Sequence, residues 1–167
     1  VIRPLFTSRP DSSFMGCCAH LLICRAHITN MTAHSSQSTV KGEDGKRRCA
    51  WCVSDPQYMK YHDTEWGKPV TDDQKLYEKL CLEGFQAGLS WLTILRKREN
   101  FREAFQGFDP ETVAKFTSRD ITRLMKNEGI VRNRMKIEAT IANAKATLRV
   151  QDELDSLSTL IWSFAPQ

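Results

Sequence analysis

Hydrophobic residues recur at helical spacing along much of the chain. Leu76, Tyr77, Leu80 and Cys81 form one apolar stripe, and a 3.6-residue period places such positions on one face of a helix. Further stripes of this kind are Trp91, Ile94, Leu95, Phe101 and Phe105, then Val113 and Phe116, then Ile121, Leu124 and Met125, and then Ile137, Ile141, Ala144 and Leu148. No segment alternates convincingly with a period of two. We therefore predict an all-α domain.

Helix-start signals precede several of these stripes. Asp72 and Gln74, just after Thr71, have the arrangement of a capping box. Asp109 followed by Pro110 is a strong helix start, because aspartate caps free backbone amides and proline suits the first turn. Ser118 is the predicted cap of the next helix.

One stretch, residues 80–91, is hard to explain by packing alone. It places Glu83 inside an apolar run and follows it with Gly84 and Gly88. A glycine costs roughly 1 kcal/mol relative to alanine inside a helix, so this pair predicts a turn or a close backbone approach. Such a bend would direct Glu83 and Trp91 at a common space. The alternative is a solvated helix glutamate beside a core tryptophan.

Aromatic residues are dense between residues 49 and 67. This segment also holds Cys49, Cys52 and His62, which are potential metal ligands, beside a Trp-Gly turn. We interpret the aromatic residues as either a wall of the core or the lining of a flat pocket. They are Trp51, Tyr58, Tyr61 and Trp66.

The segment 126–137 has the pattern of a helix-hairpin-helix motif. Gly129 is predicted to end one helix, and two apolar residues then lead into a cationic helix start. In such a motif the hairpin amides and the following helix N-terminus hold a phosphate, while cationic side chains add charge. The cationic residues are Arg132, Arg134 and Lys136. The alternative is a glycine helix cap and an ordinary loop.

Residues 1–45 show neither helical nor strand periodicity over a useful length. We predict a disordered or leader segment over 1–45 and a folded domain over 46–167. The chain begins with Val, so Met15 and Met31 are candidate initiators. A transit peptide stays open. The expected location is thus the cytoplasm or nucleoid of a bacterium, or the nucleus or an organelle if the leader is a targeting segment.

Composition narrows the protein class further. The chain is 41% hydrophobic and 26% charged, as in ordinary globular proteins. No apolar run approaches the roughly 18–20 residues that span a bilayer, so we expect no membrane partner. The net charge is +4, whereas residues 96–149 alone carry +6, which is compatible with a nucleic-acid partner. The six irregularly spaced cysteines indicate a reducing compartment rather than a disulfide scaffold.

Taken in order, these motifs resemble those of the 3-methyladenine DNA glycosylase I family of base-excision repair enzymes. The resemblance extends from Arg48 to Pro166. The segments that carry it are Arg48-Cys49-Ala50-Trp51, Tyr61-His62-Asp63-x-Glu65-Trp66-Gly67, Leu82-Glu83-Gly84-x-Gln86-Ala87-Gly88-Leu89-Ser90-Trp91, Arg98-Glu99-Asn100 and Gly129-Ile130-x-Arg132-x-Arg134-x-Lys136-Ile137. Several ordered motifs in register are far more specific than any one of them.

The resemblance implies an enzyme that excises 3-methyladenine from alkylated double-stranded DNA by cutting the N-glycosidic bond. Such an enzyme flips the base out of the duplex and binds it in a pocket. By motif position, Trp91 would stack on the base and Glu83, the catalytic candidate, would accept hydrogen bonds from its edge. The remaining base-binding candidates are Trp51, Tyr58, Tyr61 and Trp66, whose electron-rich faces suit a cationic base.

The resemblance also assigns the DNA-contacting residues. Gly88 and Leu89 would form a wedge in the base stack, and Gly129 with Arg132 would anchor a phosphate, next to Arg134 and Lys136. We expect a monomer and a monofunctional glycosylase without a lysine nucleophile. A catalytic aspartate just beyond the hairpin is absent from the family, and no carboxylate of this sequence clearly takes that role.

Family members hold a structural zinc with two Cys and two His residues. Cys49 and His62 match the first pair, and the second pair is absent from this sequence, so we expect a fragment whose C-terminal part is missing. Cys52 is a third candidate ligand. Two alternatives to the enzyme stay open. One is a catalytically incomplete helix-hairpin-helix DNA-binding fragment, and the other is a zinc-dependent interaction domain that uses Cys49, Cys52 and His62.

Overall fold

The structure, a computed structural model, describes residues 39–166. It begins with a hairpin of β1 (Thr39–Lys41) and β2 (Arg47–Cys49), followed by the short helical turn η1 (Ala50–Cys52). The helices are α2 (Pro56–Thr64), α3 (Asp73–Gln86), α4 (Trp91–Ala104), α5 (Pro110–Val113), α6 (Ser118–Lys126), α7 (Arg134–Leu154) and α8 (Leu157–Ser163), with a short turn η2 (Gln106–Phe108) between α4 and α5. The described chain is mostly helical, so the predicted all-α class is confirmed.

The hairpin contains the only β-strands within residues 39–166. Its strands pair antiparallel, with Thr39 opposite Cys49, and the Arg47 guanidinium donates to Thr39 Oγ1. Strands of three residues are too short for a period of two to be visible in the sequence. The prediction of disorder for residues 1–45 is therefore wrong for residues 39–45, and the rest of that stretch lies outside the described residues.

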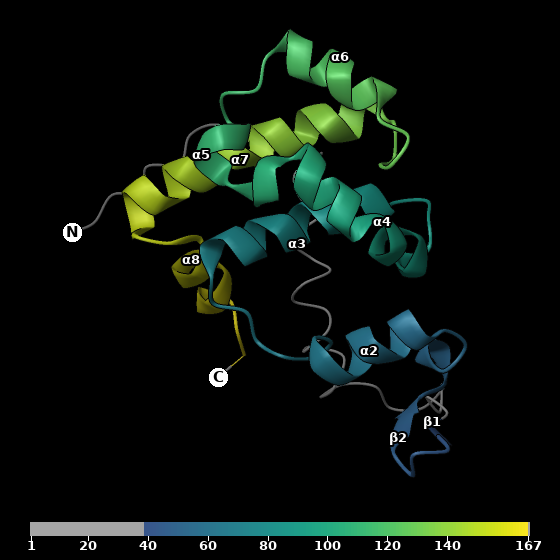
Figure 1. Cartoon of the computed structure of the whole chain (residues 1–167). Helices are drawn as coiled ribbons and strands as arrows, with labels where there is room; N and C mark the ends of the chain where they lie inside the picture. The colour runs from purple at the N-terminus through teal and green to yellow at the C-terminus, as the bar shows by residue number, and fades with distance from the viewer. Residues whose placement is uncertain (1–38, 167) are drawn as a thin grey trace, which may run out of the picture.

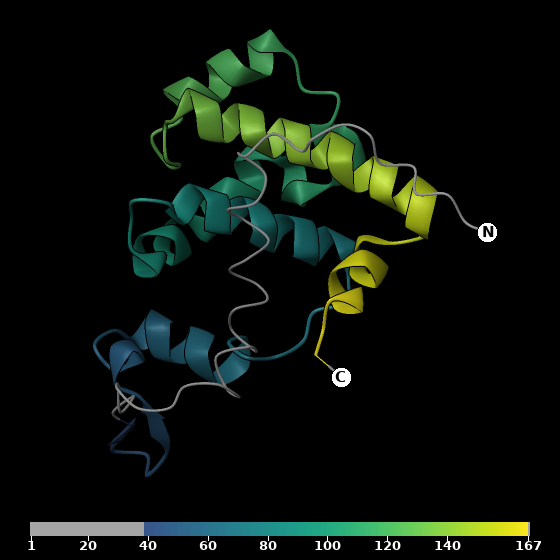
Figure 2. The ribbon, with the colours of Figure 1, turned by 180° about the vertical axis from the view of Figure 1, so that it is seen from behind.

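Helix α3 lies in the middle of the fold and contacts α4, α7 and α8. Figure 1 shows α3, α4 and α7 in the centre, with α6 at one end and α2 with the hairpin at the other. Figure 2, from behind, shows α7 running along the length of α3 and α8 near the start of α3. The residues of α3 therefore face both the core and the space toward α2.

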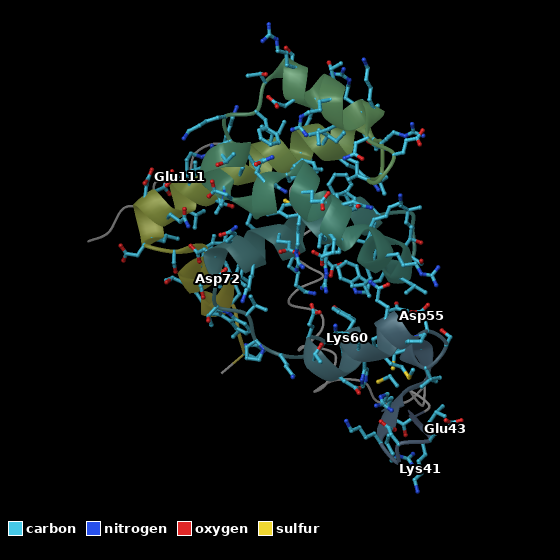
Figure 3. All side chains as sticks on the ribbon, viewed as in Figure 1. Lys41, Glu43, Asp55, Lys60, Asp72 and Glu111 are labelled. Atoms are coloured by element: carbon cyan, nitrogen blue, oxygen red, sulfur yellow. The ribbon has the colours of Figure 1, made fainter. Side chains whose placement is uncertain are left out.

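Side-chain caps fix where the helices begin. Asp72 accepts a hydrogen bond from the Lys75 amide at 2.8 Å and caps α3. Asp109 caps α5 with Pro110 in its first turn, as predicted. The predicted cap Ser118 is the first residue of α6 instead, and Thr117 forms the capping box with Asp120. Figure 3 labels Asp72 and Glu111 near the starts of α3 and α5.

The core contains a group of stacked phenylalanines, here called the phenylalanine cluster. Its members, Phe85, Phe101, Phe105 and Phe108, are all buried. Phe85 and Phe101 have ring centroids 4.5 Å apart, and Phe105 and Phe108 lie 5.4 Å apart. These rings join α3, α4 and η2 without any polar atom.

In the described part of the chain, no helix is long and apolar enough to cross a membrane.

Candidate functional site

The bend predicted around Glu83 begins later than expected. Helix α3 continues through Gly84 to Gln86, so the prediction that Gly84 breaks the helix is wrong. The chain turns at Gly88, whose φ of 81° favours glycine. Ser90 then caps α4 by accepting a hydrogen bond from the Thr93 amide at 3.1 Å. Glu83 thus lies in the last turn of α3, and Trp91 is the first residue of α4.

A pocket of about 210 Å³ opens between α2, α3 and the start of α4. It brings together the carboxylate and all five aromatic residues that sequence reasoning selected, although they come from four separate segments. The residues that line it are Trp51, Tyr58, Tyr61, Trp66, Glu83, Gln86 and Trp91. The four aromatics of residues 49–67 all line this pocket, and Tyr61 is at the same time part of the hydrophobic core.

The aromatic rings of the pocket pack mostly edge to face. Trp51 lies 4.7 Å from Tyr58 and 5.6 Å from Trp66 by ring centroids, and Tyr61 lies 5.5 Å from Trp91. Such tilted pairs expose ring faces rather than stacking them against each other. Burial also raises the pKa of Tyr58, so its hydroxyl stays protonated and can donate a hydrogen bond.

The pocket is closed at one side and open at the other. Tyr61 and Trp91 are buried, whereas Trp51 and Trp66 are 37% and 38% exposed. The Trp91 indole nitrogen is buried and has no hydrogen-bond partner among the described residues. A buried donor without an acceptor costs about 1–3 kcal/mol, and such groups are few in folded proteins.

Glu83 has a basic neighbour that the sequence analysis did not select. Lys79, one turn earlier on α3, places its Nζ 3.8 Å from Glu83 Oε1 and donates to the Tyr61 hydroxyl at 3.1 Å. The same Nζ lies 5.1 Å from the centroid of the Trp91 ring. Lys79 does not line the pocket, but it contacts three residues that do.

Gln86 is the one residue lining the pocket for which no role was predicted. It lies three residues after Glu83, and side chains at this spacing share one face of a helix. Its amide supplies both donors and acceptors to the pocket. The spacing from Glu83 is the signal that identifies it, once α3 is known to continue through Gly84.

Ion pairs between α2 and α4 hold the aromatic wall in place. Arg98 binds Glu65, the residue before Trp66, through two hydrogen bonds of 2.6 and 3.0 Å. Burial alone would raise the pKa of Glu65, but Arg98 lowers it below its ordinary value. Arg96 pairs with Asp55 at 2.7 Å, and Figure 3 labels Asp55 at the end of α2 nearest α4.

The segment between α6 and α7 is a tight turn anchored on α4. Lys97 Nζ donates to the carbonyl of Gly129 at 3.2 Å, as does the Asn100 amide at 3.3 Å. A side chain at Gly129 would lie only 3.0 Å from Asn100 and from the side chain of Asn127. Close packing therefore favours glycine at this position, whether or not a phosphate binds there.

The cationic residues that follow the turn have different environments. Arg132 and Arg134 are exposed and pair loosely with Glu128 at 3.6 Å and Glu138 at 3.1 Å. Lys136 instead donates to the carbonyls of Phe85 and Ala87 at the C-terminal end of α3. A cation at this end of a helix is stabilised by the helix dipole.

Lys136 therefore joins the start of α7 to the end of the helix that carries Glu83, and its DNA contact stays a prediction. At the adjoining turn, Gly88 and Leu89 are exposed.

The predicted zinc ligands do not form a complete site within residues 39–166. His62 stacks on Trp66 and its Nδ1 lies 3.0 Å from Asp63 Oδ1. Cys52 donates its thiol to the Cys49 carbonyl, and burial raises the pKa of that thiol. No three His, Cys, Asp or Glu residues of the described chain are placed to hold a metal. The structure thus gives no support to Cys49, Cys52 and His62 as a three-ligand set.

The fold and the pocket define a class of protein. A helical domain with a small aromatic pocket and one carboxylate is suited to bind a flat, cationic ring, since aromatic faces and a carboxylate both attract positive charge. The comparisons with known proteins agree with this class. A family model described as methyladenine glycosylase matches residues 51–167, and the chain belongs to this family.

Curated relatives show the same similarity. The chain is 54% identical over 117 residues to the DNA-3-methyladenine glycosylase of Haemophilus influenzae, covering 70% of this chain and 63% of that protein. It is 50% identical over 117 residues to DNA-3-methyladenine glycosylase 1 of Escherichia coli, with the same coverage of both chains. The chain therefore spans less than two thirds of the length of these relatives.

Solved structures of similar proteins share the fold. A crystal structure of 3-methyladenine DNA glycosylase I is 51% identical, with a TM-score of 0.68 over 70% of this chain and 64% of that one. The Staphylococcus aureus 3-methyladenine DNA glycosylase I is 46% identical, with a TM-score of 0.67 over 69% of this chain and 61% of that one. A variant of such an enzyme in complex with 3-methyladenine is 45% identical, with a TM-score of 0.67 over 69% of this chain and 62% of that one.

Proposed function

We propose that the chain carries the base-binding site of a DNA-3-methyladenine glycosylase, which hydrolyses the N-glycosidic bond of 3-methyladenine in alkylated DNA. The observation that carries the proposal is the meeting of Glu83 with five aromatic side chains in one pocket of about 210 Å³. The similarity to curated proteins named DNA-3-methyladenine glycosylase supports it further.

The chemistry of the substrate fits this set of residues. Methylation at N3 places a positive charge on the adenine ring while the base is still bonded to the sugar. A positively charged base is already a good leaving group, so strong general acid catalysis is not required. The pocket then needs only to hold the base, orient its edge and favour its charged form. Trp91 would stack on the ring, and Glu83 would accept hydrogen bonds from the base edge and stabilise its charge.

Double-stranded DNA is the proposed partner, approached through a helix-hairpin-helix formed by α6, the turn at Gly129 and α7. The exposed Leu89 would enter the base stack when the base flips out. Arg132 and Arg134 would contact phosphates near the N-terminus of α7. We also propose that a monomer suffices, because the pocket is lined by residues of one chain.

Zinc binding by Cys49 and His62 stays a proposal drawn from the family resemblance. It is supported only by the presence of these two ligand types, and no step of the reaction is assigned to a metal. The zinc content of the purified protein, compared with a Cys49→Ala variant, tests it. Equal and substoichiometric zinc in both proteins would reject it.

The test of the proposed function is a Glu83→Gln substitution, followed by isothermal titration calorimetry with 3-methyladenine and with adenine. Loss of a charge-assisted hydrogen bond costs about 1.5–3 kcal/mol, so we expect 3-methyladenine to bind roughly tenfold or more weakly. Release of 3-methyladenine from methylated duplex DNA should fall in parallel. Glu103→Gln, at an exposed position on α4 outside the pocket, is the matched control and should change neither measurement.

Two results would contradict this proposal. If the unaltered chain binds adenine as well as 3-methyladenine, the pocket does not select the alkylated base. If it binds methylated DNA with strong salt dependence but releases no base, the chain is a DNA-binding fragment without catalysis.

A further inference from the structure

Lys79 is a cation placed against the wall of a pocket whose other features favour cationic ligands. Its Nζ lies 5.4 Å from the centroid of the Tyr61 ring and 5.1 Å from that of the Trp91 ring. It is also 3.8 Å from Glu83 Oε1. The same three groups, two ring faces and one carboxylate, are those that would attract the charge of an alkylated base.

The position of Lys79 is well defined rather than one conformer of a free surface lysine. Its side chain is 29% exposed, and the Glu83 side chain is 21% exposed. Its Nζ donates to the Tyr61 hydroxyl at 3.1 Å, and Tyr61 is itself buried. Partial burial weakens solvent screening, so the ammonium acts on charges inside the pocket at short range.

We infer that Lys79 is a positioning residue that sets the charge preference of the pocket, lowering its affinity for cationic bases relative to neutral ones. This inference rests on the proposed function. The ammonium pairs with the Glu83 carboxylate, which would also bind the ligand. It also lies near the rings of Tyr61 and Trp91, whose faces would attract a cationic ligand. The net charge of a cationic base therefore meets both an attraction and an opposing charge, whereas a neutral base of the same shape has only its hydrogen bonds and ring contacts with the pocket.

This arrangement matters because the reaction changes the charge of the base. When the C1′–N9 bond breaks, its electron pair moves to the base, and 3-methyladenine leaves as a neutral molecule. The positive charge passes to the sugar, where water adds to C1′ and loses a proton to solvent. A nearby ammonium raises the energy of the charged ground state more than that of the neutral product, so it favours bond cleavage.

The test uses two ligands that differ in charge. At mildly alkaline pH, free 3-methyladenine is neutral, whereas 3,9-dimethyladeninium is a cation in which a methyl group replaces the sugar. Both ligands are titrated calorimetrically into the unaltered protein and into Lys79→Met, and for each protein the affinity for the cation is divided by the affinity for the neutral base. The contribution of the extra methyl group cancels when this ratio is compared between the two proteins. We expect Lys79→Met to tighten binding of the cation roughly three- to tenfold and to change binding of the neutral base less than about twofold.

Two further variants show whether the effect comes from charge at this position. Lys79→Arg keeps the charge and should keep the ratio of the unaltered protein. Lys75→Met removes a lysine from an exposed position one turn earlier on α3 and should leave the ratio unchanged. With methylated DNA, Lys79→Met should lower KM and also lower kcat, a split that simple loss of structure would not produce.

The outcomes separate this inference from the proposed function. If the unaltered protein binds neither ligand, both fail together. If it binds both ligands but Lys79→Met changes their affinities by the same factor, only the role of Lys79 is rejected. Weaker binding of the cation by Lys79→Met would likewise reject it, because it would show that Lys79 helps to hold the charged base.

Discussion

The molecule has two aromatic clusters on opposite faces of α3, and they are built from different residues. The phenylalanine cluster is buried and has no polar atoms. The pocket is built from Trp and Tyr, is partly open, and includes Glu83. Because successive helix residues turn by about 100°, Phe85 points away from the face that Glu83 and Gln86 share. A single helix therefore supports the core with one side chain and the pocket with its neighbours.

The contrast shows what distinguishes an aromatic core from an aromatic site. Phe101 and Phe105 gain from complete burial, and their rings contact other rings on several sides. Trp51 and Trp66 keep more than a third of their surface exposed. Leaving such rings exposed forgoes hydrophobic stabilisation, which fits the binding role proposed for them.

The largest expected effect is on the core side of this comparison. Phe101→Ala removes a fully buried ring and should lower the free energy of unfolding by about 3–5 kcal/mol. Urea denaturation followed by circular dichroism at the helical wavelengths measures this loss. A change below about 1 kcal/mol would mean that the cluster repacks without strain.

The next effect is on the pocket side and should be on binding rather than stability. Stacking of a base on an aromatic side chain is worth about 1–3 kcal/mol, so Trp66→Ala should weaken 3-methyladenine binding roughly tenfold. Its unfolding free energy should change much less than that of Phe101→Ala, because the ring is 38% exposed. Equal losses of stability in the two variants would contradict the division between core and site.

The smallest effect concerns the two ion pairs of Arg48, one within the hairpin and one that joins the hairpin to α2. Arg48 binds both Asp44 and Asp63, which lowers the pKa of Asp44 to about 2 from an ordinary value of 3.8 and lowers that of Asp63 further. A carboxylate with a depressed pKa stabilises the fold above its unfolded pKa, and this contribution disappears as the pH falls through the folded pKa.

The Arg48–Asp44 contact within the hairpin should therefore weaken between about pH 4 and pH 2, whereas the Arg48–Asp63 contact should persist to lower pH. Amide chemical shifts of residues 44–49, followed by NMR during acid titration, measure this change. Arg48→Met should move the transition up toward the ordinary value of 3.8, since it has no guanidinium to lower the pKa of Asp44. An unchanged titration in that variant would show that Arg48 is not its cause.

Much of the site was predictable because it depends on residue types that the core does not need. An acid and a tryptophan in the stretch 80–91, with four aromatics near a Trp-Gly turn, identified six of the seven pocket residues. Gly84 misled the prediction, because a helix packed on several sides tolerates one glycine in its interior. Lys79 was missed, and Lys136 was predicted only as a DNA contact. A lysine on a helix face carries no distinguishing signal in the sequence until its contacts are known.

Long-range contacts account for the remaining differences. Lys136 contacts carbonyls about fifty positions earlier in the chain, and no local pattern indicates such a pairing. The role of Gly129 likewise depends on Asn100 of another helix. Helix positions follow from local periodicity, whereas these contacts arise only when the helices pack together.

The distribution of tryptophan gives the protein an optical property. Of its four tryptophans, Trp51, Trp66 and Trp91 line the pocket, and the fourth, Trp162, donates its indole N–H to the carbonyl of Val70. The phenylalanine cluster contributes almost nothing to fluorescence excited at the tryptophan band. Intrinsic emission therefore reports mainly on the pocket, while circular dichroism reports on all helices. If emission and circular dichroism change together during denaturation, the pocket and the core unfold as one unit. If emission changes at a lower denaturant concentration, the pocket opens before the core unfolds.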